Sequence, residues 1–554
     1  MLRKFSSSLF LSYLILFASC NQNNHVANSE QGVASLNKDT LIEKIVTLAS
    51  DDFQGRRPFT EGETKTIEYL QSQFKSLGLE PGNGSSYLQD VPLVEIKPAE
   101  PPLVKVQTPK GVISLKNLTD YVVWTENTEP VLNIESADLV FAGFGIIAPE
   151  YNWNDYAGLN VKGKIVLVMV NDPGFATGDS TLFKGKTMTY YGRWTYKFEE
   201  AARQGAKGCL IIHNTEAASY PFTVVQNSNG GAKLHLDTRG GNEYRCPLMG
   251  WLSADAAKKI FTASGKDTSL YIQAKERGFK ALPLNIKLSA SLKVQATFNT
   301  SHNVAAKITG SSRPDEYVIY TAHWDHFGIG KPDEKGDSIY NGALDNASGT
   351  AALLEIARAF MSRHAKPERT IVFLSVTAEE QGLLGSAYYV KHPIYPLDST
   401  VANINIDGIN NIGKTKDIAI SGGMGQSELE NYLLAEVEKQ GRYISPELHP
   451  EAGHYFRSDH FNFAKAGVPA FTTGGGLDHL EKGKAYGKQR EDDYTANYYH
   501  RPADQYDSTT WNLDGAIQDL QLLFLVGEKL ADGTDRPRWK AGSEFKAIRE
   551  KTIK

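Results

Sequence analysis

Residues 320–380 decide the fold, and three polar clusters mark them: Tyr320-Thr321-Ala322-His323-Trp324-Asp325, Gly342-Ala343-Leu344-Asp345-Asn346-Ala347-Ser348-Gly349 and Thr377-Ala378-Glu379-Glu380. Each cluster comes directly after an apolar run or directly before a helical one. The apolar residues 318–320 predict a buried strand that ends at His323. Apolar residues with the i, i+3, i+4, i+7 spacing of one helix face follow at Leu353, Ile356, Ala357 and Phe360. Residues 345–348 are therefore the loop that enters this helix.

A second buried strand is predicted over 371–376, and it brings Glu379 and Glu380 to its carboxyl end. Strand, helix and strand in this order form a βαβ unit. Because ligands bind at the carboxyl edge of such sheets, we expect the three polar clusters to meet there. The sequence thus predicts an α/β fold with three layers, in which helices cover both faces of a mostly parallel central sheet.

Imidazole and carboxylate groups with no cysteine nearby are typical ligands of a hard or borderline divalent metal ion. The strand predicted over 401–406 ends at another acid, and a histidine follows near the C-terminus. The candidate ligands are His323, Asp345, Glu380, Asp407 and His500. One ion needs about three protein ligands, so this set is enough for two ions if one carboxylate bridges them. Paired ions occur in aminopeptidases and phosphatases, and Glu379 is left over as a general base.

At these positions the chain resembles peptidase family M28, a family of co-catalytic zinc peptidases. The matching motifs occur in the family's order: His323-Trp324-Asp325, residues 343–349, residues 379–386, Asn405-Ile406-Asp407-Gly408, and residues 499–504. The resemblance implies two Zn²⁺ ions, with Asp345 as the bridging ligand and Glu379 as the base. His323, Glu380, Asp407 and His500 would complete the coordination.

The resemblance also implies roles for residues that bind no metal. Asp325 would orient the ring of His323, and Tyr499 would steady the tetrahedral oxyanion of the reaction. Asp459 is expected to brace the site by hydrogen bonds. His326 is interpreted as a bystander.

Between residues 136 and 279 the pattern changes to short apolar runs with glycine turns. The runs 137–145, 161–168 and 201–208 resemble the protease-associated (PA) domain, a module often inserted into M28 peptidases. We therefore expect a signal peptide at 1–19, a tether at 20–38, the first part of the catalytic domain at 39–135, a β-rich PA insertion at 136–279, the main catalytic part at 280–535 and a peripheral charged tail at 536–554.

The N-terminus predicts export. Basic residues at 3–4 precede the apolar run 9–17, which is too short to cross a membrane and is typical of a secretory signal. Residues 16–20 resemble a bacterial lipobox, in which Cys20 would carry a lipid. We expect a lipoprotein on a membrane, facing the periplasm or the cell surface, and plain secretion is the alternative.

Composition limits the partners and the number of domains. The 59 Lys+Arg and 64 Asp+Glu residues leave a net charge of −5, which argues against nucleic acid as a partner. A chain of 554 residues exceeds one ordinary core, so two or more domains are expected. Cys209 lies in the apolar run 208–212, so it and Cys246 are predicted to be buried free thiols rather than a disulfide.

The predicted function is hydrolysis of peptide bonds, with release of the N-terminal residue as the leading reaction. The acidic site suits the ammonium group of such a substrate. A carboxypeptidase or dipeptidase would need a cation for the terminal carboxylate, and the candidates are Arg457, Arg501 and Arg193. A cyclase of N-terminal glutamine would work with one metal, so the full ligand set counts against it. A non-catalytic surface binding protein would have no use for a general base, so the presence of Glu379 counts against that function.

Overall fold

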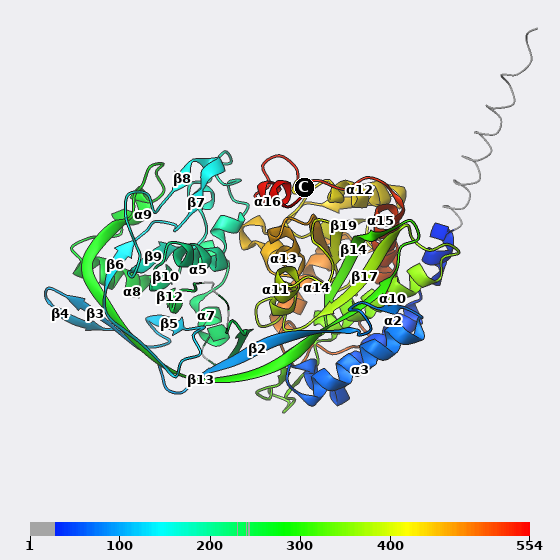
Figure 1. Cartoon of the computed structure of the whole chain (residues 1–554), viewed down its shortest axis with the longest axis horizontal. Helices are drawn as coiled ribbons and strands as arrows, with labels where there is room; N and C mark the ends of the chain where they lie inside the picture. The colour runs from blue at the N-terminus through cyan, green and yellow to red at the C-terminus, as the bar shows by residue number, and fades with distance from the viewer. Residues whose placement is uncertain (1–27, 230, 240, 242–243, 554) are drawn as a thin grey trace, which may run out of the picture. The chain divides into compact units, whose positions relative to one another are not determined.

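The computed structural model describes residues 28–229, 231–239, 241 and 244–553, which form two compact units (Figure 1). The first unit contains the described residues up to Val91, Ser301–Glu447, and the described residues from Ser458 onward. The second unit contains Pro92–Thr300 and Leu448–Arg457. The predicted signal peptide and Cys20 lie outside the described residues. Within those residues, no helix combines the length and the apolar composition that crossing a membrane requires.

The sheet of the first unit has its parallel strands in the centre. Hydrogen-bonded neighbours follow the order β1-β13-β17-β14-β18-β21-β19-β20, and β17, β14, β18 and β21 run parallel to one another. Their bounds are β1 Glu80–Pro81, β13 Leu282–Ile308, β14 Arg313–His323, β17 Arg369–Val376, β18 Thr400–Asn405, β19 Asp417–Ile420, β20 Tyr443–Ser445 and β21 Ala470–Gly474. A small hairpin pairs β15 (Gly328–Ile329) with β16 (Ile339–Tyr340).

Helices lie on both faces of this sheet (Figure 1). They are α2 Lys38–Leu48, α3 Glu61–Ser76, α10 Ser348–Met361, α11 Leu384–Lys391, α12 Leu429–Lys439, α13 His460–Lys465, α14 Gly483–Asn497, α15 Asp514–Asp532 and α16 Lys546–Thr552. Apolar side chains of α2, α3, α10, α12 and α15 form one core with the strand residues on the facing side, among them Val318, Tyr320 and Phe373. Helices α11 and α13 contact each other, and α13 contacts β18 and β21. The predicted three-layer α/β architecture is confirmed.

The βαβ unit forms as the hydrophobic pattern predicts. Strand β14 ends at His323, α10 begins at Ser348, and β17 pairs in parallel with β14 over Tyr317–His323. All eight residues of β17 are buried, which explains why its sequence is continuously apolar rather than alternating. The polar residues that follow these strands therefore share one edge of the sheet.

The second unit has a sheet of its own. Neighbouring strands follow the order β4-β3-β13-β6-β9-β10-β12-β5, in which β6, β9, β10 and β12 are parallel. Its strands are β2 Leu88–Pro98, β3 Leu103–Thr108, β4 Gly111–Ser114, β5 Tyr121–Trp124, β6 Val131–Phe141, β7 Ile147–Ala148, β8 Trp153–Asn154, β9 Ile165–Met169, β10 Gly208–Ile212, β11 Lys233–Leu236, β12 Leu248–Leu252 and the first part of β13. Its helices are α4 Pro173–Thr177, α5 Trp194–Arg203, α6 Thr215–Ala218, α7 Phe222–Asn229, α8 Ala254–Ala263 and α9 Ser269–Gln273.

The second unit is wider than the predicted insertion over 136–279. Strands β3 and β5 add residues before 136, because β3 pairs with β13 and β5 pairs with β12. The alternating burial of β13 extends the unit to Thr300. The long strands β2 and β13 continue from one unit into the other without a turn, so no break in the sequence pattern marks either boundary.

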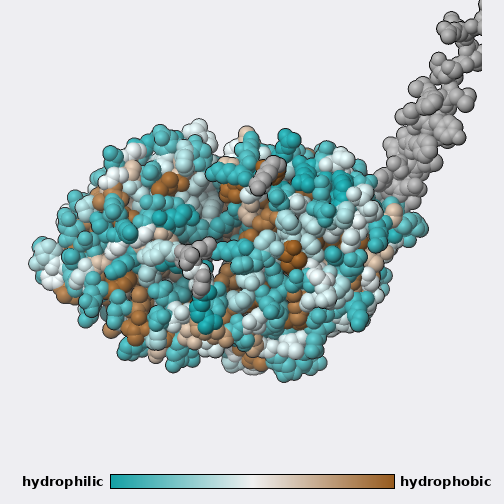
Figure 2. Space-filling view, viewed as in Figure 1, coloured by the Kyte–Doolittle hydropathy of each residue, from teal (hydrophilic) through white to brown (hydrophobic). Residues whose placement is uncertain are grey.

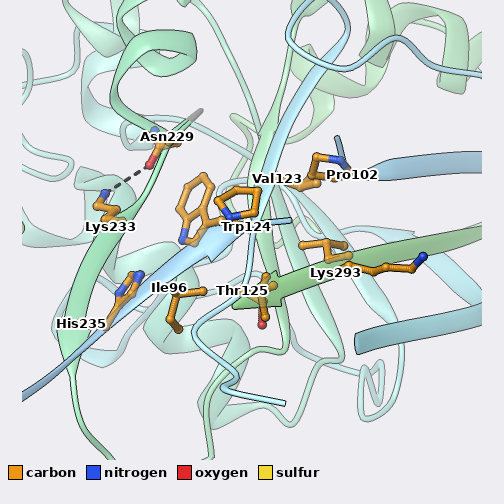
Figure 3. A pocket seen from close by; sticks show the side chains of 13 residues that line it. Ile96, Pro102, Val123, Trp124, Thr125, Asn229, Lys233, His235 and Lys293 are labelled. Atoms are coloured by element: carbon orange, nitrogen blue, oxygen red, sulfur yellow. Dashed lines mark hydrogen bonds between the residues drawn. The ribbon is translucent and has the colours of Figure 1, made fainter. Parts of the chain in front are cut away.

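A pocket in the second unit is lined by Trp124, Lys233 and His235, among others (Figure 3). The Nζ atom of Lys233 lies 5.8 Å from the Trp124 ring centroid and donates a hydrogen bond to Asn229.

On the face of the molecule drawn in Figure 2, hydrophilic residues predominate and hydrophobic ones gather only in small groups. This polar character fits a surface in contact with water.

The C-terminal tail differs from its prediction, whereas the cysteines of the second unit agree with theirs. The tail 536–554 is not peripheral, because Trp539 and Phe545 are buried and Arg549 donates to the carbonyl groups of Leu397 and Thr400. The many cationic residues of this segment predicted an exposed tail, but the guanidinium of Arg549 donates hydrogen bonds to backbone carbonyl groups. Cys209 and Cys246 are buried and free, as predicted.

Candidate metal centre

Three neighbouring parallel strands bring candidate ligands to one edge of the first unit. His323 is the last residue of β14, Glu379 and Glu380 follow β17, and Asp407 lies two residues after β18. Because β14 pairs with both β17 and β18 in parallel, the three carboxyl ends coincide. The hydroxyl of Thr350 on α10 donates to the His323 carbonyl across 2.7 Å, which ties the helix to the end of the central strand.

Asp345 lies between two histidines that are far apart in the sequence. Its Oδ1 is 3.3 Å from Nε2 of His323, and its Oδ2 is 3.2 Å from Nε2 of His500. Each imidazole also faces a second carboxylate: His323 Nε2 is 3.3 Å from Oδ1 of Asp407, and His500 Nε2 is 3.2 Å from Oε2 of Glu380. The five predicted ligands are thus brought together, as two imidazoles on either side of one shared carboxylate.

Charge neighbours set the pKa values of this cluster. Burial alone would raise the pKa of Asp345, but hydrogen bonds from His323 and His500 outweigh it and hold the pKa well below its usual range. Burial and Asp345 likewise oppose ionisation of Glu380, whereas His500 and His326 lower its pKa to about 2. Burial would lower the pKa of His500, yet Glu380 and Asp345 raise it to about 10. The carboxylates of Asp345 and Glu380 are therefore present as anions.

Glu379 differs from its neighbour Glu380 in its surroundings. Its Oε2 lies 3.9 Å from His323 Nε2, and burial together with the charges of Asp407 and Glu380 raises its pKa well above the usual value. A raised pKa makes the carboxylate a stronger proton acceptor. Two groups of donor atoms, each within 4.8 Å, have a metal-binding arrangement: His323 with Glu379 and Asp407, and His323 with Asp345 and Glu380.

Asp325 holds the site in a different way from the one predicted. Its carboxylate accepts hydrogen bonds from the backbone nitrogens of Glu379 at 2.9 Å and Glu380 at 3.4 Å. The Nδ1 atom of His323 is closer to the Asp325 backbone carbonyl, at 3.2 Å, than to its side chain, at 3.8 Å. The side chain therefore positions the two glutamates, and the main chain of the same residue positions the histidine ring.

Tyr499 lies beside the predicted ligands. Its ring stacks on His500 with a centroid distance of 3.7 Å, and 46% of the residue is exposed. Lost hydration together with the charges of Asp345 and Glu380 raises the pKa of its phenol well above 10. The hydroxyl stays protonated at neutral pH and can donate a hydrogen bond.

Two residues that the sequence left without a role hold the loop of Asp345. Asp504 accepts hydrogen bonds from the backbone nitrogens of Leu344 at 3.0 Å and Asp345 at 3.1 Å. Asn346 donates to the Ile406 carbonyl, and its Oδ1 accepts from the backbone nitrogen of Gly408. Both belong to the motifs that carry the family resemblance, so their place in those motifs was the available signal.

His326 is not the bystander that was expected. Its Nδ1 contacts Oε1 of Glu380, and the residue is 1% exposed. The sequence could not show this contact, because it depends on how the turn after β14 folds against the turn after β17. Ser386 donates a hydrogen bond to the carboxylate of Asp459. His454 belongs to the second unit, whereas His460 begins α13 in the first.

Two of the arginines proposed for a substrate carboxylate lie in the second unit. Arg457 donates from Nη2 to the Ala452 carbonyl at 2.7 Å. The guanidinium of Arg193 lies 5.3 Å from the centroid of the Trp194 ring. Within the first unit, the exposed residue Arg501 directly follows His500.

The donor set fits a divalent cation. Imidazole nitrogen and carboxylate oxygen are ligands that zinc accepts, and five buried or half-buried donors of these types converge on one point of the sheet edge.

Residues 303–525 match the model of peptidase family M28. This part of the chain belongs to peptidase family M28. Among curated relatives, aminopeptidase YwaD of Bacillus subtilis is 29% identical over 338 residues, covering 58% of this chain and 57% of its own length. A glutamate carboxypeptidase 2 homolog of Caenorhabditis elegans is 32% identical over 320 residues, covering 50% of this chain and 37% of its own length.

The alignments with four other relatives span only 16–24% of the lengths of those proteins. The solved structure of an aminopeptidase from Aneurinibacillus sp. strain AM-1 is similar to 91% of this chain and 96% of its own, with a TM-score of 0.49 and 20% identity. The family assignment therefore rests on the matched M28 residues.

Proposed function

We propose that this M28 chain is an aminopeptidase that binds two Zn²⁺ ions and removes the N-terminal residue of peptides or proteins. The observation that carries the proposal is the position of Asp345, whose two oxygens each face a different histidine. A carboxylate placed in this way is suited to bridge two cations. His323 and Asp407 would complete one site, and His500 and Glu380 the other.

Bound zinc ions would supply Lewis acidity, which lowers the pKa of water and polarises a carbonyl group. Glu379 would accept the proton of the attacking water and return it to the leaving amine. The main chain of Glu379 is held in place by the hydrogen bond that its backbone nitrogen donates to Asp325. The protonated phenol of Tyr499 would donate a hydrogen bond to the oxyanion of the tetrahedral intermediate.

The charge around the site favours a substrate with a free ammonium group. Glu379, Glu380 and Asp407 lie at the same sheet edge, and a cationic amine would be attracted to their combined charge. The experiment is a pair of otherwise identical peptides, one acetylated at the amino end and one amidated at the carboxyl end. Acetylation should abolish cleavage and amidation should not, and bound zinc should be counted by elemental analysis of the same preparation.

A carboxypeptidase is the second candidate, because the match to a relative of that name covers half of this chain. It would need a cation for the terminal carboxylate, and Arg501, directly after His500, is the candidate in the first unit. Cleavage of the acetylated peptide with loss of the amidated one would favour this reaction over the aminopeptidase.

We further propose that the second unit is a PA domain and that the protein is exported as a lipoprotein anchored through Cys20. The support for the first is the glycine-punctuated pattern of 137–145, 161–168 and 201–208, and for the second the apolar run 9–17 before residues 16–20. The substrates would then be peptides outside the cytoplasm.

A further inference from the structure

Arg56 is a fully buried arginine that makes no ion pair with any residue that the structure describes. Its guanidinium instead donates to four backbone carbonyl groups. Nε donates to Trp324 at 2.9 Å, Nη1 to Leu48 at 2.7 Å and Asn341 at 2.6 Å, and Nη2 to Gly342 at 2.9 Å. The planar group thus uses its several donors on three separate segments of the chain.

Two of those segments carry predicted metal ligands. Trp324 directly follows His323, and Gly342 begins the turn that presents Asp345. The third segment is the end of α2, whose apolar side chains belong to the main core of the first unit. Arg56 therefore joins the loop after β14 to the loop before α10 and fixes both against a helix.

The local backbone is shaped to put the guanidinium there. Gly55 has a φ of +65°, and a Cβ at this position would lie 2.5 Å from the Tyr340 carbonyl oxygen and 2.8 Å from that of Gly328. Only glycine allows this close approach to the hairpin of β15 and β16. Asn341 adds to the same junction, because its side chain donates to Ala49 and to Asp51.

We propose that Arg56 is a positioning residue for the active site, which sets the distance between His323 and Asp345 by holding the carbonyl groups of their loops. This inference rests on the proposed function. Arg56 touches neither the substrate nor the predicted ligand atoms. Burial lowers the pKa of Arg56 to about 10, whereas the charges of Asp325, Asp504, Asp345 and Glu380 act in the opposite direction.

If Arg56 had only a structural role, replacing it would destabilise the fold in the same way as replacing another buried arginine. The chain contains a second buried arginine that serves as the control. Arg369 is 1% exposed and donates to the carbonyl groups of Leu530, Thr534 and Asp535, and unlike Arg56 it also pairs with the carboxylate of Glu316. It begins β17, at the opposite end of that strand from Glu379. Eight residues at about 3.3 Å each separate it from the site by roughly 25 Å.

The test compares Arg56→Lys with Arg369→Lys in the full chain. Lysine keeps the charge but presents its donors from a single nitrogen, so it cannot reach three segments at once. The affinity for Zn²⁺ is measured by competition with a chelator, and the thermal unfolding midpoint is measured on the metal-free proteins. Replacing a residue that orients a metal ligand without binding the metal itself typically lowers the affinity for the metal by about 10–100-fold.

We expect Arg56→Lys to bind zinc about 10–100-fold more weakly than the wild type, with a parallel loss of kcat/KM. Arg369→Lys should lower the unfolding midpoint but bind zinc as the wild type does. Equal losses of zinc affinity in the two variants, or wild-type affinity in Arg56→Lys, would overturn the inference.

Asn341→Ala is a milder variant of the same junction, for use if Arg56→Lys does not fold. It should weaken zinc binding in the same direction by a smaller factor, and unchanged affinity in it would also overturn the inference. A wild type that binds no zinc overturns the proposed function itself. A wild type that binds two ions, with a variant that binds them equally well, overturns only the role of Arg56.

Discussion

Oδ2 of Asp504 accepts a hydrogen bond from the backbone nitrogen of Asp345 across 3.1 Å. The other oxygen of Asp504 accepts from the preceding residue, Leu344, at 3.0 Å. The turn that carries Asp345 is therefore fixed by a side chain that lies 159 residues farther along the chain. The direction in which the Asp345 carboxylate points depends on this contact.

Asp504→Asn should weaken zinc binding by about 10–100-fold. The amide retains one acceptor oxygen but turns an NH₂ group toward one of the two backbone donors, which leaves that donor unpaired. Affinity is measured by chelator competition. Asp417→Asn is the control, because that carboxylate also accepts from two backbone nitrogens, those of Leu477 and Asp478. The same loss in both variants would contradict a specific role for Asp504.

Glu379→Gln should lower kcat by about 10²–10⁴-fold while the zinc content stays at the wild-type level. Glutamine keeps the size of the side chain but cannot accept the proton. Steady-state kinetics and elemental analysis on one preparation check both statements. Glu355→Gln, which changes a buried carboxylate on α10 that pairs with Lys44, should keep the wild-type kcat. Near-normal turnover in Glu379→Gln would show that the assigned base is wrong.

Asp345→Asn and His500→Ala should differ in how much zinc they retain. A bridging carboxylate serves both ions, whereas His500 faces only one of the two oxygens of Asp345. We therefore expect Asp345→Asn to lose both ions and His500→Ala to lose mainly one. Elemental analysis after gel filtration gives the stoichiometry. Full occupancy in Asp345→Asn would exclude the bridge.

The stability of the second unit should fall in mild acid because of His235. Burial, with Lys233 and Arg245, lowers its pKa to about 4, although Glu126 acts in the opposite direction. Between pH 6.5, the ordinary histidine value, and pH 4, the unfolded chain binds a proton that the folded chain does not. Stability is then complete above that window and is lost as the pH falls through it.

The difference amounts to about 3 kcal/mol at most, at 1.36 kcal/mol per pKa unit. His235→Gln should remove most of this pH dependence, as measured by denaturant unfolding at pH 7 and pH 4.5. His364→Gln changes an exposed histidine and should keep the wild-type profile. An unchanged profile in His235→Gln would place the acid-labile group elsewhere.

Cys20→Ser should move the protein from the membrane fraction to the soluble exported fraction. A lipid chain contributes about 0.8 kcal/mol per buried CH₂ group, and the anchor depends on this one thiol. Specific activity should not change, because Cys20 precedes the folded units. A wild type that is already soluble, with an unmodified N-terminus, would rule out the lipoprotein.

The sequence by itself determined the layout of the catalytic sheet and the identity of the candidate ligands. Buried parallel strands have continuous apolar runs, so 318–320 and 371–376 marked β14 and β17. In a βαβ unit the polar residues after such strands must meet at one edge. His323, Asp345 and Glu380 could therefore be grouped without coordinates.

Only the tertiary structure decided which atoms face one another and which residues hold them. Turns that fold against one another place each oxygen of Asp345 next to a different histidine. The same folding of the turns creates the contacts of Asp325, Asp504, His326 and Arg56. Such contacts join positions as distant as Arg56 and Gly342, which are 286 residues apart. Hydrophobic periodicity reports the face on which a residue lies, whereas a hydrogen bond to a backbone carbonyl depends on the path of the main chain, which leaves no pattern in the side chains.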